Sequence, residues 1–373
     1  MTNPLQVLIV DDDWTAILEG IKHDVVHPTD EDFSSKLERV GSYDTLLIDQ
    51  NLELPMAISL AASDGASLVG HFRSWSRSQQ IGLPPLVITT SDADAFSQEI
   101  PAVGPPTPVN GSFVGREHRL APSLDVEWLL RKNDPNLSEK VVNMSEAWSS
   151  LLAGHGRSDT LPALLGLTVG AGTEPPGWQA LARRAITEAT LTFQLAGVDY
   201  RVAAQGTMRW LLHRALAYPG MLVSDTHAAW ALNVTKDSLA AYHAKDTAGG
   251  LAECVYTGIL SAFFPRRWWL AGLDLLNWEI DRRMGVDGID RASRQKHLDG
   301  LLPGSGLVDH QTSGTVVAWS SDLVECDAIH TDDAVQLRPP GWPADAIFPW
   351  AARSEAAIDP VLRSMVQGLE DDA

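Results

Sequence analysis

The stretch VLIVDDD, residues 7–13, decides the fold. Four consecutive apolar residues are typical of a strand buried on both faces of a parallel sheet, and the acidic run stands where such a strand ends. LLID at 46–49 repeats this arrangement, and the apolar runs LVI at 86–88 and WLL at 128–130 follow it. Helical stretches such as 65–75 lie between the runs. The alternation predicts an α/β domain with a doubly wound parallel sheet.

Polar side chains follow these runs at the edge where open α/β sheets bind ligands. Asp11, Asp12 and Asp49 contribute carboxylates, Thr90 contributes a hydroxyl, and Lys132 contributes an ammonium group. Carboxylates ~4 Å apart repel by about 4 kcal/mol at an effective dielectric of about 20, so their convergence predicts a bound cation. A divalent ion such as Mg²⁺ prefers these oxygens and leaves Asp49 able to attack a phosphoryl group. Lys132 and Thr90 can then bind the new phosphoryl oxygens.

In order and type, these residues resemble the receiver domain of two-component response regulators, over about residues 4–145. The resemblance implies a flavodoxin-like parallel sheet of five strands. It also implies that Asp49 is the phospho-acceptor, that Thr90 is the switch hydroxyl, and that Lys132 is the family's lysine. The DG pair at 64–65 resembles the family's DG before its third helix. The Mg²⁺ ligands that the resemblance implies are Asp11, Asp12, Asp49 and the backbone carbonyl of Asn51.

Three features depart from the family's pattern. Lys132 is followed by Asn133, where the family usually has a proline in a cis bond. The interval from Thr90 to Lys132 is longer than usual and contains a Pro/Gly-rich stretch, residues 100–122, which predicts a long loop inserted into the first domain. Residues 13–25 leave little room for a full first helix.

The remainder of the chain shows a different pattern. From about residue 138 the apolar residues recur at helical spacing. We therefore expect a first domain over residues 1–145, and a mainly α-helical output or interaction domain over residues 146–373. Near the C-terminus, strands are predicted over 315–319 and 323–329, and a final helix over 354–369. No output family is recognised in this part.

Composition limits the classes of function. The 373 residues contain 28 Lys plus Arg against 48 Asp plus Glu, and the net charge of −20 disfavours binding to nucleic acid or to an anionic membrane surface. Two cysteines are too few for a disulfide framework, and the N-terminal residues lack the pattern of a signal peptide. The predicted location is the cytoplasm.

An enzymatic helical part would need a nucleophile and a base. The candidate nucleophile is Cys254, and the candidate base is His243, eleven residues before it. The alternative is that Cys254 is a small buried hydrophobic residue. Trp269 likewise lies on an apolar stripe with Leu273, which favours a core position.

The sequence thus predicts a response regulator of a phosphorelay, a signalling phosphoprotein rather than a metabolic enzyme. A histidine kinase or phosphotransfer protein would phosphorylate Asp49 in the presence of Mg²⁺. Rearrangement near Thr90 would then change how the helical domain contacts a protein partner or a second copy in a homodimer. The alternative is a pseudo-receiver, a phosphate sink or scaffold without transmitted output. Response regulators with unrecognised C-terminal domains resemble the regulators of bacterial anti-phage two-component systems. The alternative therefore includes a role in such a system.

Overall fold

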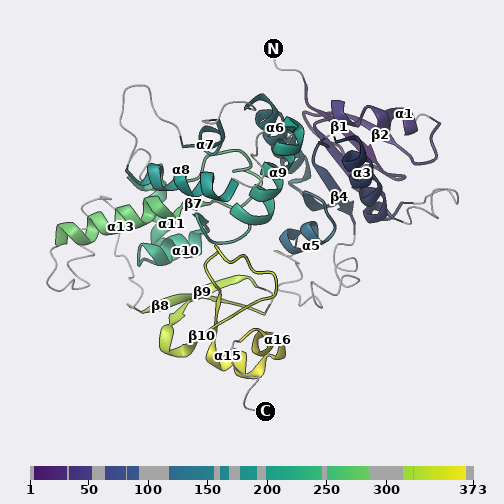
Figure 1. The fold of residues 1–373 in the computed structure, drawn as a ribbon. Helices are drawn as coiled ribbons and strands as arrows, with labels where there is room; N and C mark the ends of the chain where they lie inside the picture. The colour runs from purple at the N-terminus through teal and green to yellow at the C-terminus, as the bar shows by residue number, and fades with distance from the viewer. Residues whose placement is uncertain are drawn as a thin grey trace, which may run out of the picture. The chain divides into compact units, whose positions relative to one another are not determined.

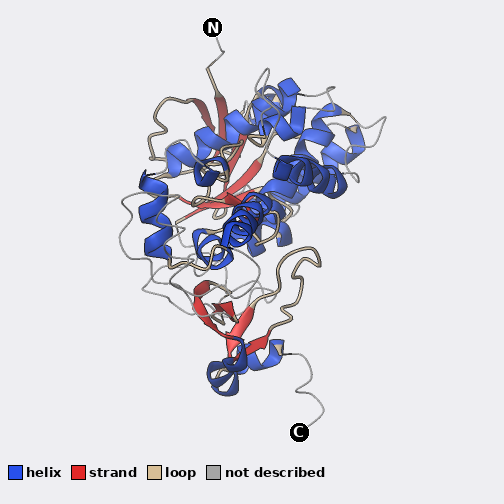
Figure 2. Ribbon diagram, turned by 90° about the vertical axis from the view of Figure 1, so that its left-hand side faces the viewer, coloured by secondary structure: helices blue, strands red, loops and turns tan. Residues whose placement is uncertain are grey.

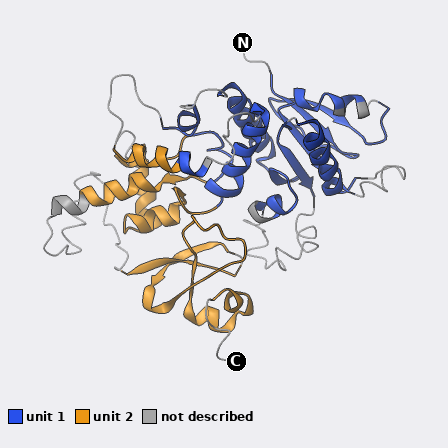
Figure 3. Cartoon of the chain, viewed as in Figure 1, with its two compact units in different colours: residues 1–168, 186–217, 258–264 blue, residues 169–185, 218–257, 265–373 orange. Residues whose placement is uncertain are grey.

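The structure is a computed structural model, and it forms two compact units, which are described separately (Figure 3). Unit 1 contains Met1–Thr168, Ile186–Ala217 and Gly258–Phe264, and unit 2 contains the rest. Both units are discontinuous in sequence, whereas the division expected at residue 145 is continuous; that division stays a prediction. The residues described are 4–31, 33–52, 64–80, 82–91, 117–154, 160–167, 177–190, 199–245, 250–284, 314–321 and 323–366.

Unit 1 is built around a five-stranded sheet with the order β2-β1-β3-β4-β5, in which all neighbouring strands are parallel (Figure 1). All residues of β3 and β4 are buried, which explains their continuous apolar sequences. The predicted α/β fold with a parallel sheet is therefore confirmed. The strands are Gln6–Val10 (β1), Lys22–Val26 (β2), Thr45–Asp49 (β3), Leu86–Thr90 (β4) and Trp128–Arg131 (β5).

Helices cover this sheet (Figure 2). Helix α3 packs against β3 and β4, and α6 packs against β3. The α6 contact includes a buried hydrogen bond of 2.8 Å between the hydroxyls of Ser145 and Thr45. Side chains alternate along a strand, so α6 covers the face of the sheet that carries Thr45, Leu47 and Asp49. The helical segments of unit 1 include α1 (Phe33–Glu38), η1 (Val40–Ser42), α3 (Gly65–Gln79), α5 (Glu117–Ser123), α6 (Leu137–Gly154), α7 (Thr160–Leu164), α9 (Tyr200–Trp210) and η3 (Leu211–Ala215).

The connection from β1 to β2 contains no helix, as the short interval predicts. Residues 11–21 form a loop that is held against the start of α6. The Ser138 hydroxyl donates a hydrogen bond to the Ile17 carbonyl at 3.2 Å and accepts one from the Glu19 amide at 3.3 Å. The absence of this helix agrees with the expected departure from the receiver pattern.

The predicted loop over residues 100–122 needs a correction. Its last part is helical, since α5 runs from Glu117 to Ser123 with Pro122 inside it. Leu120 and Ala121 are buried, so apolar burial favours a helix despite the proline. The earlier part of this loop, up to residue 116, lies outside the described residues.

Helix α9 borders the amino-terminal edge of the sheet, opposite the acidic edge. Arg201 donates a hydrogen bond of 2.6 Å to the carbonyl of Gly41, which precedes β3. A side chain at Gly82, before β4, would collide with the backbone of Arg201. The chain after residue 186 therefore contributes to the unit that contains the sheet.

Unit 2 begins with helices around an apolar core. Trp268, Leu273 and Tyr242 are among its buried members, and Cys254 is 1% exposed in the same core. Trp269 is also buried, at the end of a two-stranded pairing, as the core interpretation predicts. The elements are α8 (Gly177–Thr190, whose first part belongs to this unit), β6 (Leu222–Val223), α10 (Asp225–Ala231), α11 (Lys236–Lys245), α12 (Gly250–Glu253), β7 (Trp268–Trp269) and α13 (Leu270–Met284).

The C-terminal part of unit 2 is a four-stranded sheet with the order β10-β11-β8-β9, so the predicted small β element is present. The single helix expected over 354–369 is two helices, because Pro360 starts a new helix that Asp359 caps. None of the described helices is long and apolar enough to cross a bilayer. The elements are β8 (Thr315–Trp319), β9 (Glu325–His330), η4 (Thr331–Asp333), β10 (Ala334–Gln336), β11 (Trp350–Ala352), α15 (Arg353–Ile358) and α16 (Pro360–Met365).

Candidate functional site

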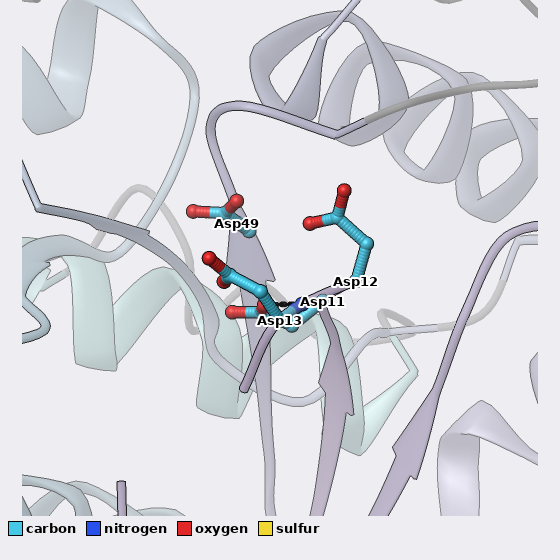
Figure 4. A group of neighbouring side chains, drawn as sticks. All are labelled: Asp11, Asp12, Asp13 and Asp49. Carbon is cyan, nitrogen blue, oxygen red and sulfur yellow. Dashed lines mark hydrogen bonds between the residues drawn. The ribbon is translucent and has the colours of Figure 1, made fainter. Parts of the chain in front are cut away.

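Four carboxylates converge at the carboxyl edge of the five-stranded sheet. Asp11, Asp12 and Asp13 follow β1, and Asp49 ends β3. Each residue offers an oxygen, and these oxygens lie within 4.8 Å of one another. Asp11 and Asp49 are buried, whereas Asp12 and Asp13 are exposed. Figure 4 shows the carboxylates of Asp11, Asp13 and Asp49 gathered together, with Asp12 approaching from the other side.

Strand register explains why Asp11 and Asp49 are neighbours. Val10 of β1 is the Cα partner of Ile48 in β3, so the next residue of each strand lies at the same level. Asp11 continues the strand pairing, because its amide donates a hydrogen bond of 3.2 Å to the Val26 carbonyl in β2. Two adjacent parallel strands thus end in acids on the same face of the sheet.

Lys132, directly after β5, reaches three of these acids. Its Nζ lies 2.9 Å from an oxygen of Asp11, 2.9 Å from an oxygen of Asp13 and 3.1 Å from an oxygen of Asp49. The amide of Lys132 donates a hydrogen bond of 3.0 Å to the Thr90 carbonyl, which holds the residue against β4. The ammonium group therefore lies among the carboxylates.

Burial and charge change the pKa values in this cluster. Desolvation raises the pKa of the Asp11 carboxyl from 3.8 to about 6, despite hydrogen bonds from Lys132 and from the Asp13 amide. Burial also raises the pKa of Asp49, although Lys132 opposes the change. Burial alone would lower the pKa of Lys132, but hydrogen bonds to Asp13 and Asp11 raise it above its usual value. The hydrogen bond from Lys132 lowers the pKa of exposed Asp13. Negative charge is therefore unfavourable at the two buried acids.

The start of α3 packs against the end of β3, next to the acidic cluster. Asp64 caps this helix, and its side chain accepts a hydrogen bond of 2.8 Å from the Ser67 amide. The Gly65 amide donates to the Gln50 carbonyl at 3.0 Å. A Cβ atom at Gly65 would collide with the Asp49 carbonyl oxygen, so a glycine is needed where the helix starts against β3. The DG pair is thus explained by contact with the end of β3.

The donor set fits a hard divalent cation. The described cluster holds four carboxylates and one ammonium group, so negative charge is in excess. Carboxylate oxygens are preferred ligands of Mg²⁺, which usually keeps several water molecules and binds to one or two protein carboxylates. The exposed side chains of Asp12 and Asp13 leave room for such an arrangement. The cluster could therefore hold a metal ion, and a bound Mg²⁺ stays a prediction.

The structure brings four of the predicted site residues together and does not place the other two in the cluster. Asp11, Asp12, Asp49 and Lys132 meet, as described above. Thr90 is buried at the end of β4, with Arg131 as its Cα partner in β5. Asn51 is exposed two residues after Asp49, and its carbonyl stays a predicted ligand. Asp13 is the member missing from the predicted set. Strand alternation was the signal that could have included it, since it lies two residues after Asp11.

The alternative nucleophile lies in a different environment. Cys254 is part of the apolar core of unit 2, and its thiol donates to the Gly250 carbonyl at 3.1 Å. The His243 ring contacts Trp268, with ring centroids 5.3 Å apart. These contacts favour a structural role for both residues.

Comparisons with known proteins return no significant match to this chain, whether with family models, with curated proteins or with solved structures. The geometry of the acidic cluster and the order of the strands therefore carry the functional interpretation.

Proposed function

We propose that this chain is a response regulator whose N-terminal part is a receiver with a flavodoxin-like sheet, and that Asp49 accepts a phosphoryl group. One observation supports the proposal most: Asp49 ends the central strand of a parallel sheet with the order 2-1-3-4-5, beside Asp11 and under the ammonium group of Lys132. The strand order and the positions of Asp11, Asp49 and Lys132 support the resemblance to a receiver.

The chemistry follows from the groups around Asp49. Its carboxylate oxygen attacks the phosphorus of a phosphodonor, a P–O bond forms to Asp49, and the bond to the donor breaks with its electron pair on the leaving group. Lys132, now shared among carboxylates, can move toward the new phosphoryl oxygens. Asp11, Asp12, Asp49 and the Asn51 carbonyl would hold Mg²⁺, which would supply positive charge to offset the acids and the phosphoryl group. Thr90 is proposed as the switch hydroxyl.

Labelling by a small-molecule phosphodonor tests the proposal. Wild-type protein with Mg²⁺ should acquire acid-labile phosphate from acetyl phosphate, and Asp49→Asn should acquire none. Asp44→Asn is the matched control, because Asp44 lies just before the same strand, at its opposite end, where it accepts a hydrogen bond from the Gln6 amide. The control should be labelled like the wild type. Equal labelling of Asp49→Asn and wild type would refute the assignment.

The proposed partners follow from this chemistry. A histidine kinase or a phosphotransfer protein would supply the phosphoryl group, and unit 2 would contact a protein partner. Hydrogen exchange of residues 218–245 and 314–366, with and without beryllofluoride and Mg²⁺, tests whether a signal is transmitted. A change in protection supports a relay, and unchanged protection supports the alternative of a phosphate sink.

A further inference from the structure

A second threonine lies beside the acidic cluster and is not used in the proposed function. Thr89, in β4, is 0% exposed, and its Oγ1 has no hydrogen-bond partner among the described residues. A buried hydroxyl without a partner costs roughly 1–3 kcal/mol, and such groups are rare in folded proteins. The position therefore calls for an explanation.

Strand register places Thr89 next to Asp49. The two residues are Cα partners in β4 and β3, so both side chains leave the sheet on the same face. The other partner of Thr89 is Leu130 in β5, and Lys132 follows two residues later. Thr89 therefore lies in β4, between Asp49 in β3 and the strand β5, from which Lys132 extends. Thr90 is the next residue and the last of the strand.

The contact between Lys132 and Asp49 suggests when the Thr89 hydroxyl forms a hydrogen bond. Lys132 Nζ lies 3.1 Å from Asp49 Oδ1 and also pairs with Asp11 and Asp13. If Lys132 moves to a phosphoryl group, this Asp49 oxygen loses its donor. Thr89 is the Cα partner of Asp49 in β4, and its buried hydroxyl has no hydrogen-bond partner among the described residues.

We propose that Thr89 is a positioning residue that donates a hydrogen bond to the Asp49 carboxyl oxygen once Lys132 has left it. This inference rests on the proposed phosphorylation of Asp49 and adds a determinant of the lifetime of the phosphorylated form. The donor is distinct from Thr90, which the receiver resemblance assigns to the phosphoryl oxygens.

The expected effect concerns hydrolysis. Water attacks the phosphorus, a new P–O bond forms, and the bond to Asp49 breaks with its electron pair on the carboxylate. The proton of the attacking water leaves with the released phosphate or passes to solvent. A hydrogen bond from Thr89 stabilises the departing carboxylate, so the bond should accelerate hydrolysis. Its loss should lengthen the half-life of the phosphorylated protein by roughly threefold to tenfold.

Thr89→Val tests the inference, because valine keeps the shape of the side chain and removes the hydroxyl. Thr89→Ser restores the hydroxyl and is the matched rescue. Thr89→Ala is a second hydroxyl-free variant if the valine does not fold. The first measurement is urea unfolding in EDTA, where Thr89→Val should be at least as stable as wild type since no hydrogen bond is lost. Marked destabilisation relative to Thr89→Ser would show that the hydroxyl is already bonded in the resting protein, and would overturn the inference.

The second measurement is the decay of phosphate label after removal of acetyl phosphate. Thr89→Val should retain its label longer than wild type, and Thr89→Ser should decay like wild type. Equal half-lives of the valine variant and the wild type would overturn this inference alone. A wild type that acquires no label would overturn the proposed function as well, so the two failures are distinguishable.

Discussion

The two ends of β5 carry charged clusters of opposite character. Before the strand, Glu127 is 0% exposed, and both of its oxygens lie 2.8 Å from the same nitrogen of Arg73. The Leu86 amide also donates to Glu127, at 2.6 Å. After the strand, Lys132 is shared by three carboxylates, and burial raises the pKa values of Asp11 and Asp49.

This difference separates a structural cluster from the candidate functional site. At the amino-terminal edge, further cations face the acids, since Arg209 pairs with Asp125 at 2.5 Å. At the carboxyl edge, four acids outnumber the one ammonium group of the described cluster. Acids that each face an arginine are expected to hold elements together, whereas an excess of acids is expected to favour a cationic ligand. The predictions below test this contrast.

Glu127→Ala should have the largest effect on stability. The substitution leaves Arg73 buried without its carboxylate partner, and we expect the free energy of unfolding to fall by roughly 3–5 kcal/mol. Urea denaturation measures the change. Glu38→Ala is the control, because this glutamate is an exposed acid of the same unit and should change stability by about 0.5 kcal/mol or less. A similar loss in both variants would remove the contrast between buried and exposed acids.

Gly65→Ala should disturb the carboxyl edge directly. The new Cβ collides with the Asp49 carbonyl, so α3 or the end of β3 must shift, at a cost of about 2 kcal/mol. Gly70→Ala, in the same helix, is the control, since nothing lies within 4 Å of its Cβ position. It should be neutral or stabilising because alanine favours helix. Thermal unfolding and Mg²⁺ titration of both variants check the expectation, and equal behaviour would contradict it.

Low pH should lower the stability of the protein through His213, which lies at the amino-terminal edge of the sheet. Its Nε2 lies 2.9 Å from the Glu127 carbonyl, and burial lowers the pKa of the imidazole. A lowered folded-state pKa means that stability is complete above the unfolded value of about 6.5 and is lost as the pH falls below it, by at most about 1.4 kcal/mol per pH unit. Urea midpoints from pH 7 to pH 5 measure this loss. His213→Gln should have a smaller slope, and an unchanged slope would exclude His213 as the cause.

Asp11→Asn should have the smallest effect on stability, and it should stabilise the protein. Because the raised pKa of Asp11 shows that its charged form is unfavourable in the folded state, removing the charge should stabilise the metal-free protein by about 1 kcal/mol at pH 7. Asp134→Asn is the control: its carboxylate pairs with Lys140 at 2.6 Å, so that variant should lose stability. Thermal unfolding in EDTA compares them. Destabilisation by Asp11→Asn would mean that the acidic edge is a structural cluster as well.

Four of the five strands were predictable because their residues are almost all buried, including those of the edge strand β5. Residues 7–10, 46–48, 86–88 and 128–130 all lie within the parallel strands. The strand β2 was not predicted, because it is partly exposed, unlike the other edge strand, and its sequence KHDVV begins with three polar residues. The convergence of Asp11, Asp12, Asp49 and Lys132 was also predictable, since parallel strands end at one edge.

The remaining features depend on tertiary contacts that a local pattern does not contain. Strand alternation could have placed Asp13 at the acidic edge, but its contact with Lys132 joins residues that are 119 positions apart in sequence. The orphaned hydroxyl of Thr89 appears only once β3 and β4 are in register. The association of α9 with the sheet depends on Arg201 and Arg209, whose sequence neighbourhood is that of an ordinary amphipathic helix.

The return of the chain to unit 1 has a consequence for how this protein can evolve. A domain made from one continuous stretch can be exchanged between genes by a recombination event at each end. Unit 1 needs three stretches, and the second of them supplies Arg209 and His213 to the surroundings of Glu127. A gene fusion that takes only the first stretch would separate these side chains from their partners. We therefore expect the five-stranded sheet and the later helices of unit 1 to be inherited together.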